Sequence, residues 1–313
     1  MSSNTSIVFF VIKKILIHGQ YFCVYPSAFL DEPRCPYTPE HYRMPYENVE
    51  LRTSDGVTLR CYLMTANQAT SIRATVIMFL GNGMEIGGGE ELKIAKKFFK
   101  LQCNVLMVSY RGYGLSGGSP TEKGLRRDAQ AALDYVLSQP RLASSPIVVY
   151  GLSLGGAVAI DLTKRNPSKI SALIVENTFT SLPGVVRSWP IIGFLSFLCH
   201  QKWNSAQKIN CIPPTLPILM LSGRNDEVVP PIHMDKLHQL ALARGRPTKR
   251  FQKNNEQPED AEDGSNSTVL EEFPFGTHAF TSEASGYSTA IRRFLNRDDT
   301  QKNSKDAVSS KSS

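Results

Sequence analysis

Hydrophobic and polar residues follow two different patterns along the chain. Between Glu47 and Met64 they alternate around a Ser54-Asp55-Gly56 turn, which predicts an antiparallel hairpin. Further on, short runs consist almost only of apolar residues, as in parallel strands that are buried on both faces. These runs cover residues 74–80, 105–108, 147–150, 172–175 and 218–221, and a further strand is expected at 268–273.

Segments with helical spacing of apolar residues lie between these runs, at 91–100, 123–137 and 155–165, and a closing helix is expected at 287–295. Strand and helix therefore alternate. This order predicts an α/β fold with a mostly parallel, doubly wound sheet and an antiparallel N-terminal edge. Ligand sites in such sheets lie at the carboxyl ends of the strands, so the loops there should carry the chemistry.

The N-terminal segment departs from this pattern. Residues 7–17 read IVFFVIKKILI, and a second apolar patch follows at 21–25. A spanning helix needs about 20 apolar residues, and Lys13 and Lys14 interrupt the run. Residues 1–25 are therefore predicted to anchor the protein at a membrane, as an interfacial helix or a short span. A surface helix on the globular body and a cleaved signal peptide are the alternatives, although no charged side chain precedes the apolar run, as it would in a signal peptide.

Two polar segments flank the last part of the fold. Residues 298–313 contain one Val and one Ala as their only apolar residues, which predicts a disordered tail. Residues 244–267 change from basic to acidic and contain a single aromatic residue, Phe251, which predicts a long surface loop. The folded domain is thus expected over residues 26–297.

Composition excludes several classes of function. Lys plus Arg number 35 against 28 Asp plus Glu, and this net charge of +7 is scattered, which argues against nucleic acid as a partner. The six cysteines form no CxxC pair, and the histidines and carboxylates lack ligand spacing, so no metal is expected. The sequence GYGLSGG at 112–118 lacks the spacing of a phosphate-binding loop, so no cofactor is expected.

A candidate nucleophile stands in residues 151–156, GLSLGG, which follow one predicted strand and open one predicted helix. This is the context of a nucleophile elbow, in which the serine occupies a strained turn and the flanking glycines leave space for it. The helix N-terminus also favours developing negative charge. Ser153 is therefore the predicted nucleophile, whereas Ser116 lacks this flanking pattern.

The predicted general base is His278, because a serine hydroxyl needs a neighbouring base at neutral pH. His278 follows the predicted strand at 268–273 and precedes the closing helix. The sequence places the other histidines near the N-terminus or on a lid or helix surface: His18, His41, His200, His233 and His238.

The predicted acid is Asp226, which follows the run at 218–221 and completes the chain order Ser, Asp, His of this type of fold. Glu227 on the same loop and Glu176 at the end of the preceding run are its rivals. An oxyanion also needs donors. These are expected from the backbone N–H of Leu154 and that of Asn82 or Gly83 in the sequence GNGMEIG at 81–87, for which a plain glycine-rich turn is the alternative.

Six motifs together resemble the bud-emergence-type group of α/β-hydrolases: GNGMEIG, SYRGYGLSGGSPTEKGLRRDAQAALDYV, YGLSLGGAVAIDL, ENTFTS, SGRNDEVVPP and FPFGTHAF. The resemblance covers about Tyr25 to Leu295. It implies a membrane-associated serine hydrolase of the α/β-hydrolase fold, with Ser153, Asp226 and His278 as its triad. It also implies a cap at about 179–210, in which residues 189–198 could line an apolar acyl-chain pocket.

Two positions depart from the resembling group. Leu80 precedes Gly81-Asn82 where relatives often have His, and Ala279-Phe280 follows His278 where they often have Asn-Asp. The function expected is hydrolysis of a carboxylic ester or thioester through an acyl-enzyme on Ser153. A serine peptidase or amidase is the alternative reaction, and a non-catalytic, membrane-associated binding protein is the alternative class. The expected partners are the acyl substrate and a membrane surface.

Overall fold

The computed structural model describes residues 19, 21, 24–29, 36–67, 71–188, 193–246 and 266–296. Most of the predicted anchor at 1–25, nearly all of the polar insertion and the whole tail at 298–313 therefore lie outside the described residues. Within the described ranges, no helix combines the length and the apolar character needed to cross a membrane.

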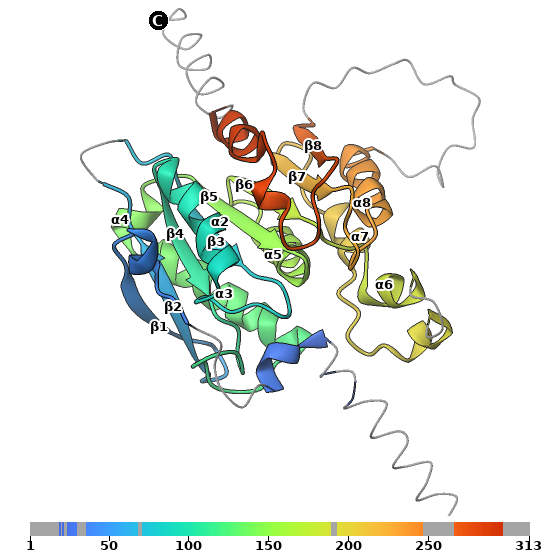
Figure 1. The fold of residues 1–313 in the computed structure, drawn as a ribbon, viewed down its shortest axis with the longest axis horizontal. Helices are drawn as coiled ribbons and strands as arrows, with labels where there is room; N and C mark the ends of the chain where they lie inside the picture. The colour runs from blue at the N-terminus through green and yellow to red at the C-terminus, as the bar shows by residue number, and fades with distance from the viewer. Residues whose placement is uncertain are drawn as a thin grey trace, which may run out of the picture.

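In the described part of the chain, eight strands form one sheet in the order β1-β2-β4-β3-β5-β6-β7-β8 (Figure 1). The pairs β1–β2 and β2–β4 are antiparallel, and the other pairs are parallel. The predicted fold class is confirmed. The strands are β1 (Glu47–Arg52), β2 (Thr58–Met64), β3 (Ala74–Phe79), β4 (Cys103–Val108), β5 (Ile147–Leu152), β6 (Ala172–Glu176), β7 (Ile218–Gly223) and β8 (Thr268–Phe273).

Helices alternate with the parallel strands, as the sequence pattern predicted. The α-helices are α2 (Gly89–Lys100), α3 (Glu122–Ser138), α4 (Pro140–Ala143), α5 (Leu154–Arg165), α6 (Leu182–Ser188), α7 (Ser205–Ile209) and α8 (Ile232–Leu242), and residues 287–296 are also helical. Short 3₁₀ turns are η1 (Pro26–Phe29), η2 (Pro39–Tyr42), η3 (Gly193–Leu198) and η5 (Thr281–Glu283).

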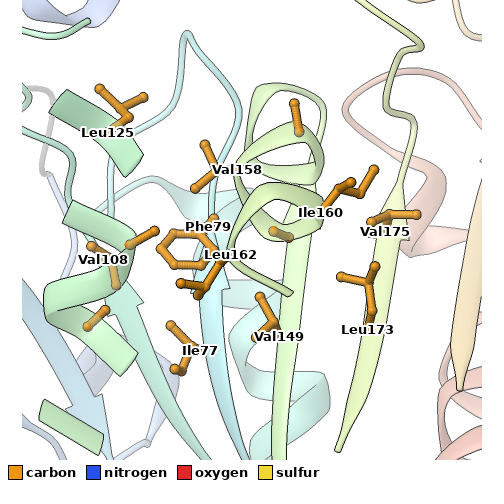
Figure 2. Packing of buried hydrophobic residues seen from close by; sticks show 14 of the residues in the cluster. Ile77, Phe79, Val108, Leu125, Val149, Val158, Ile160, Leu162, Leu173 and Val175 are labelled. Atoms are coloured by element: carbon orange, nitrogen blue, oxygen red, sulfur yellow. The ribbon is translucent and has the colours of Figure 1, made fainter. Parts of the chain in front are cut away.

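The helices cover both faces of the sheet. On one face, Leu125 of α3 and Leu162 of α5 pack with Ile77, Val149 and Leu173 of the central strands (Figure 2). On the other face, α2 and the helical residues 287–296 pack over the alternate side chains of the same strands. Every residue of β3 to β7 is buried, which explains why these strands read as continuous apolar runs.

Two side chains assigned to the surface from the sequence are buried. Arg244, the first residue of the predicted surface loop, is 3% exposed and donates to the carbonyl groups of Pro213, Leu216 and Ala241. His233, expected on a lid or helix surface, is 6% exposed on the inner side of α8. Both predictions were wrong because backbone and hydroxyl groups from other segments satisfy these polar side chains inside the fold.

Candidate active site

The predicted nucleophile lies on the turn between β5 and α5. Ser153 has φ 55° and ψ −117°, a strained conformation for a residue other than glycine. Its N–H donates to the carbonyl oxygen of Glu176 at 2.9 Å, and its carbonyl oxygen accepts from the Thr178 hydroxyl at 2.7 Å. The last residue of β6 and the segment that follows it therefore hold this turn in its strained form.

Two glycines make the turn possible. A Cβ atom on Gly151 would lie 2.1 Å from the carbonyl oxygen of Gly155, and one on Gly155 would lie 2.1 Å from that of Phe79. Both close approaches involve backbone atoms, so a side-chain movement could not relieve them. The glycines at these positions let α5 begin directly against the end of β3, which is where the loop at 81–87 starts.

Three loops bring the predicted catalytic side chains together. Ser153 Oγ lies 3.0 Å from His278 Nε2, and His278 Nδ1 lies 2.7 Å from Asp226 Oδ2. All three residues are buried. The other oxygen of Asp226, Oδ1, accepts hydrogen bonds from the N–H groups of Val228 and Val229, which fix the carboxylate against the imidazole. This arrangement can transfer the serine proton to the histidine and hold the resulting imidazolium.

The rival carboxylates have other partners in the described structure. The Glu227 carboxylate accepts a hydrogen bond from the backbone N–H of His278 at 3.4 Å. This contact involves the main chain of His278 and not its imidazole ring. The Glu176 carboxyl group is buried and accepts from the hydroxyl groups of Tyr150 and Tyr287. Burial raises the pKa of this carboxyl group to about 7. The geometry thus favours Asp226 as the partner of the imidazole.

Other candidates from the sequence have structural contacts. The buried His233 ring has Nδ1 2.8 Å from the Thr180 hydroxyl, and burial lowers the pKa of this histidine. Ser116 donates to the carbonyl oxygen of Ser109 and accepts from the N–H of Arg60, so it joins two backbone segments. Among the residues that the structure describes, no group of histidine, cysteine and carboxylate side chains could hold a metal ion.

The expected oxyanion donors lie on adjoining segments. Leu154 is the first residue of α5, and N–H groups in the first turn of a helix have no partner within the helix. Asn82 and Gly83 lie in the turn after β3, and the Tyr113 hydroxyl donates to the carbonyl oxygen of Asn82 at 2.8 Å. This contact fixes the turn. The assignment of these N–H groups to an oxyanion stays a prediction.

Asn177 is a buried residue for which the sequence indicated no role. It follows β6 with φ 43°, in the left-handed region that asparagine tolerates better than most residues. Its side-chain amide joins the loops that carry His278 and Asp226. The Nδ2 group donates to the carbonyl oxygens of Thr277 and His278 and to the Thr281 hydroxyl at 3.0–3.1 Å, and Oδ1 accepts from the N–H of Gly223 at 2.8 Å. The motif ENTFTS was the available signal, because it places an amide at a strand end.

Substitution of Asn177 tests this connection. Asn177→Ala is expected to lower the free energy of unfolding by about 3 kcal/mol or more, because several buried backbone groups lose their partner. Asn177→Gly also removes the amide, but glycine adopts the positive φ of this position without strain. The free energies of unfolding of the two variants should therefore differ by about 1 kcal/mol at most. Urea denaturation measures both. An Asn177→Ala variant as stable as the original protein would show that the amide does not hold the loops.

The segment between β6 and β7 contains α6, η3 and α7 (Figure 1). Residues 189–192 of the expected acyl-chain pocket lie outside the described residues. Phe194 and Phe197 on η3 are 73% and 72% exposed. These two side chains therefore face solvent and do not line the enclosed pocket that the sequence suggested.

The sheet, the elbow and the arrangement of Ser153, His278 and Asp226 define the α/β-hydrolase class. A family model described as "Serine aminopeptidase, S33" matches residues 70–199. The chain is 42% identical over 281 residues to Protein bem46 of Schizosaccharomyces pombe, an alignment that covers 88% of this chain and 85% of the relative. It is also 42% identical over 223 residues to alpha/beta hydrolase domain-containing protein WAV2 of Arabidopsis thaliana, covering 67% and 71%. The chain therefore belongs to the α/β-hydrolase family of these relatives.

A further relative and two solved structures extend the comparison. An uncharacterized membrane protein of Saccharomyces cerevisiae is 33% identical over 282 residues, covering 90% of both chains. A Pyrococcus furiosus esterase has a TM-score of 0.64 at 20% identity, covering 86% of this chain and 97% of its own. An alpha-beta hydrolase from Vibrio vulnificus has a TM-score of 0.63 at 19% identity, covering 90% of both. At such low identity these structures show the fold alone.

Proposed function

We propose that this protein is a serine hydrolase that cleaves a carboxylic ester or thioester through an acyl-enzyme on Ser153. The observation that carries the proposal is the line of contacts from Ser153 Oγ through the His278 ring to the Asp226 carboxylate. Side chains from three loops are needed to build it, and all three are buried at the carboxyl edge of the sheet.

The reaction follows from these positions. Ser153 Oγ attacks the carbonyl carbon while His278 Nε2 takes the hydroxyl proton, and Asp226 stabilises the imidazolium through Nδ1. The N–H of Leu154 and an N–H of the turn at 82–83 receive the negative charge on the substrate oxygen. The imidazolium then protonates the leaving alcohol or thiol. Water, activated by the same imidazole, releases the acid from Ser153.

An ester or thioester suits this site better than an amide. An alkoxide or thiolate leaves a tetrahedral intermediate more readily than an unprotonated amine, so less is demanded of the general acid. The Pyrococcus furiosus esterase, a solved structure of similar fold, supports this choice. The "Serine aminopeptidase" description of the family model is the observation that favours a peptidase as the second candidate.

The remaining parts of the chain are assigned in the same proposal. The hydrolase domain covers residues 26–297, with a cap at about 179–210 and the polar insertion at about 244–267. Residues 1–25 anchor the protein at a membrane, and residues 298–313 form a polar tail. The apolar sequence of residues 7–17 supports the anchor, as does the relative from Saccharomyces cerevisiae that is named a membrane protein.

An active-site probe tests the proposal directly. A fluorophosphonate should label the purified protein and should fail to label Ser153→Ala, while Ser116→Ala, a serine variant on a neighbouring loop, should keep its label. A panel of p-nitrophenyl esters, thioesters, anilides and short peptides then defines the reaction. Failure of the original protein to label would favour the binding protein, and faster cleavage of peptides than of esters would favour the peptidase.

A further inference from the structure

Large apolar side chains are exposed on four loops that each follow a parallel strand. Because the carboxyl ends of parallel strands meet at one edge of the sheet, these loops lie at the edge that also holds Ser153. Phe275, beside the histidine loop, is 88% exposed. Among the described residues, this exposed set, here called the apolar rim, consists of Leu115, Phe194, Phe197, Val228, Ile232, Phe275 and Phe280.

Hydrogen bonds join three of these loops to one another. His233 near the start of α8 lies 2.8 Å from the Thr180 hydroxyl after β6. The N–H of Asn225 after β7 donates to the carbonyl oxygen of Gly276 after β8 at 2.9 Å. Single exposed apolar residues are ordinary on a protein surface, but several large ones gathered on adjoining loops mark an interaction site.

The N-terminal segment joins the folded body at the same edge. The buried Tyr25 hydroxyl donates to Gln201 Oε1 and accepts from Trp203 Nε1, each at 3.1 Å. The N–H of Trp203 in turn donates to the carboxylate of Glu122 at 3.0 Å. Glu122 begins α3, the helix that follows β4, so this junction lies at the carboxyl edge. The apolar sequence IVFFVIKKILI ends only a few residues before it.

From these two observations we infer that the carboxyl edge docks on a lipid surface and that the substrate is an acyl ester or thioester held in that surface. The substrate part rests on the proposed function, whereas the docking does not. Phenylalanine side chains insert at the boundary between headgroups and acyl chains, and the net charge of +7 favours anionic lipids. A lipid surface is favoured over a protein partner because a protein docked on this edge would block the access of substrate to Ser153. A lipid surface would instead supply the acyl chain of the substrate to Ser153.

A fluorescent label on the rim tests the docking in the full-length protein. Cys23, Cys35, Cys199 and Cys211 are first replaced by serine, and a polarity-sensitive dye is attached to the thiol introduced by Phe275→Cys. Leu137→Cys is the matched control, because this exposed apolar residue lies near the C-terminal end of α3, at the opposite edge. On addition of phosphatidylcholine–phosphatidylserine vesicles, the emission of the rim dye should shift to shorter wavelength, and that of the control dye should not.

The same surface is tested by turnover. A Phe194→Ser/Phe197→Ser/Phe275→Ser variant should lose about tenfold or more of its activity on a long-chain ester in vesicles and keep its activity on a soluble short-chain ester. Leu137→Ser/Leu242→Ser, at the opposite edge, should keep both activities. Equal dye shifts at the two positions, or none, would overturn the docking, as would a rim shift caused by self-association without vesicles. A shift in a protein that hydrolyses no ester would keep the docking and refute the hydrolase.

Discussion

Replacement of either Ser153 or His278 by alanine is expected to lower kcat for a soluble p-nitrophenyl ester by about 10⁴-fold or more. The Ser153 hydroxyl is the proposed nucleophile, and His278 Nε2, at 3.0 Å, is the atom placed to take its proton. Because the two groups act as one unit, the double variant should be little slower than either single variant. Steady-state kinetics on the soluble ester measures kcat and KM, and KM should change far less than kcat.

His233→Ala is the matched control for this experiment. His233 is a buried histidine near the same edge, but its ring contacts the Thr180 hydroxyl and is separate from the proposed nucleophile. The variant should retain activity on the soluble ester to within about tenfold, since no proton-transfer group is lost. A His278→Ala variant with the original kcat would place the general base elsewhere.

The sequence predicted those features that depend on neighbouring residues. Continuous apolar runs identified the parallel strands because both faces of the sheet are covered. The elbow was predictable because Gly151, Ser153 and Gly155 act within five residues of one another, where close backbone packing requires glycine. His278 and Asp226 were predictable from chain order, since loops at the ends of parallel strands meet at one edge.

Features that depend on distant partners were not predictable. The amide of Asn177 binds groups that lie 46 to 104 residues away. The motif ENTFTS places an amide at a strand end but does not indicate which distant groups that amide binds. Arg244 was assigned to a polar loop because its charge suggested solvent, whereas carbonyl groups 28 and 31 residues before it accept its hydrogen bonds. The sequence also could not show whether Phe194 and Phe197 line a pocket or face solvent, because both uses need the same residue type.

Asp226→Asn is expected to lower kcat for the soluble ester by about 10³-fold to 10⁴-fold while leaving the fold intact. Asp226 Oδ2 lies 2.7 Å from His278 Nδ1 and accepts a hydrogen bond from the Nδ1–H group in the proposed mechanism, which keeps the ring proton on Nδ1. The amide of asparagine can instead donate to Nδ1, which moves the ring proton to Nε2. A protonated Nε2 cannot accept the proton of Ser153. The loss of activity would therefore come from the wrong tautomer of His278 and not from a displaced ring.

Glu227→Gln and Glu176→Gln are the controls that separate this effect from a general loss of negative charge. Glu227 reaches the backbone N–H of His278, and glutamine keeps an oxygen that can accept there. Burial raises the pKa of the Glu176 carboxyl group to about 7, so below that pH the group is mostly uncharged and glutamine resembles it. At pH near 6, both variants should therefore stay within about tenfold of the original kcat. The opposite result would be a loss of about 10³-fold or more in kcat for Glu176→Gln together with an active Asp226→Asn variant. In that case Glu176, and not Asp226, would be the acid of the site.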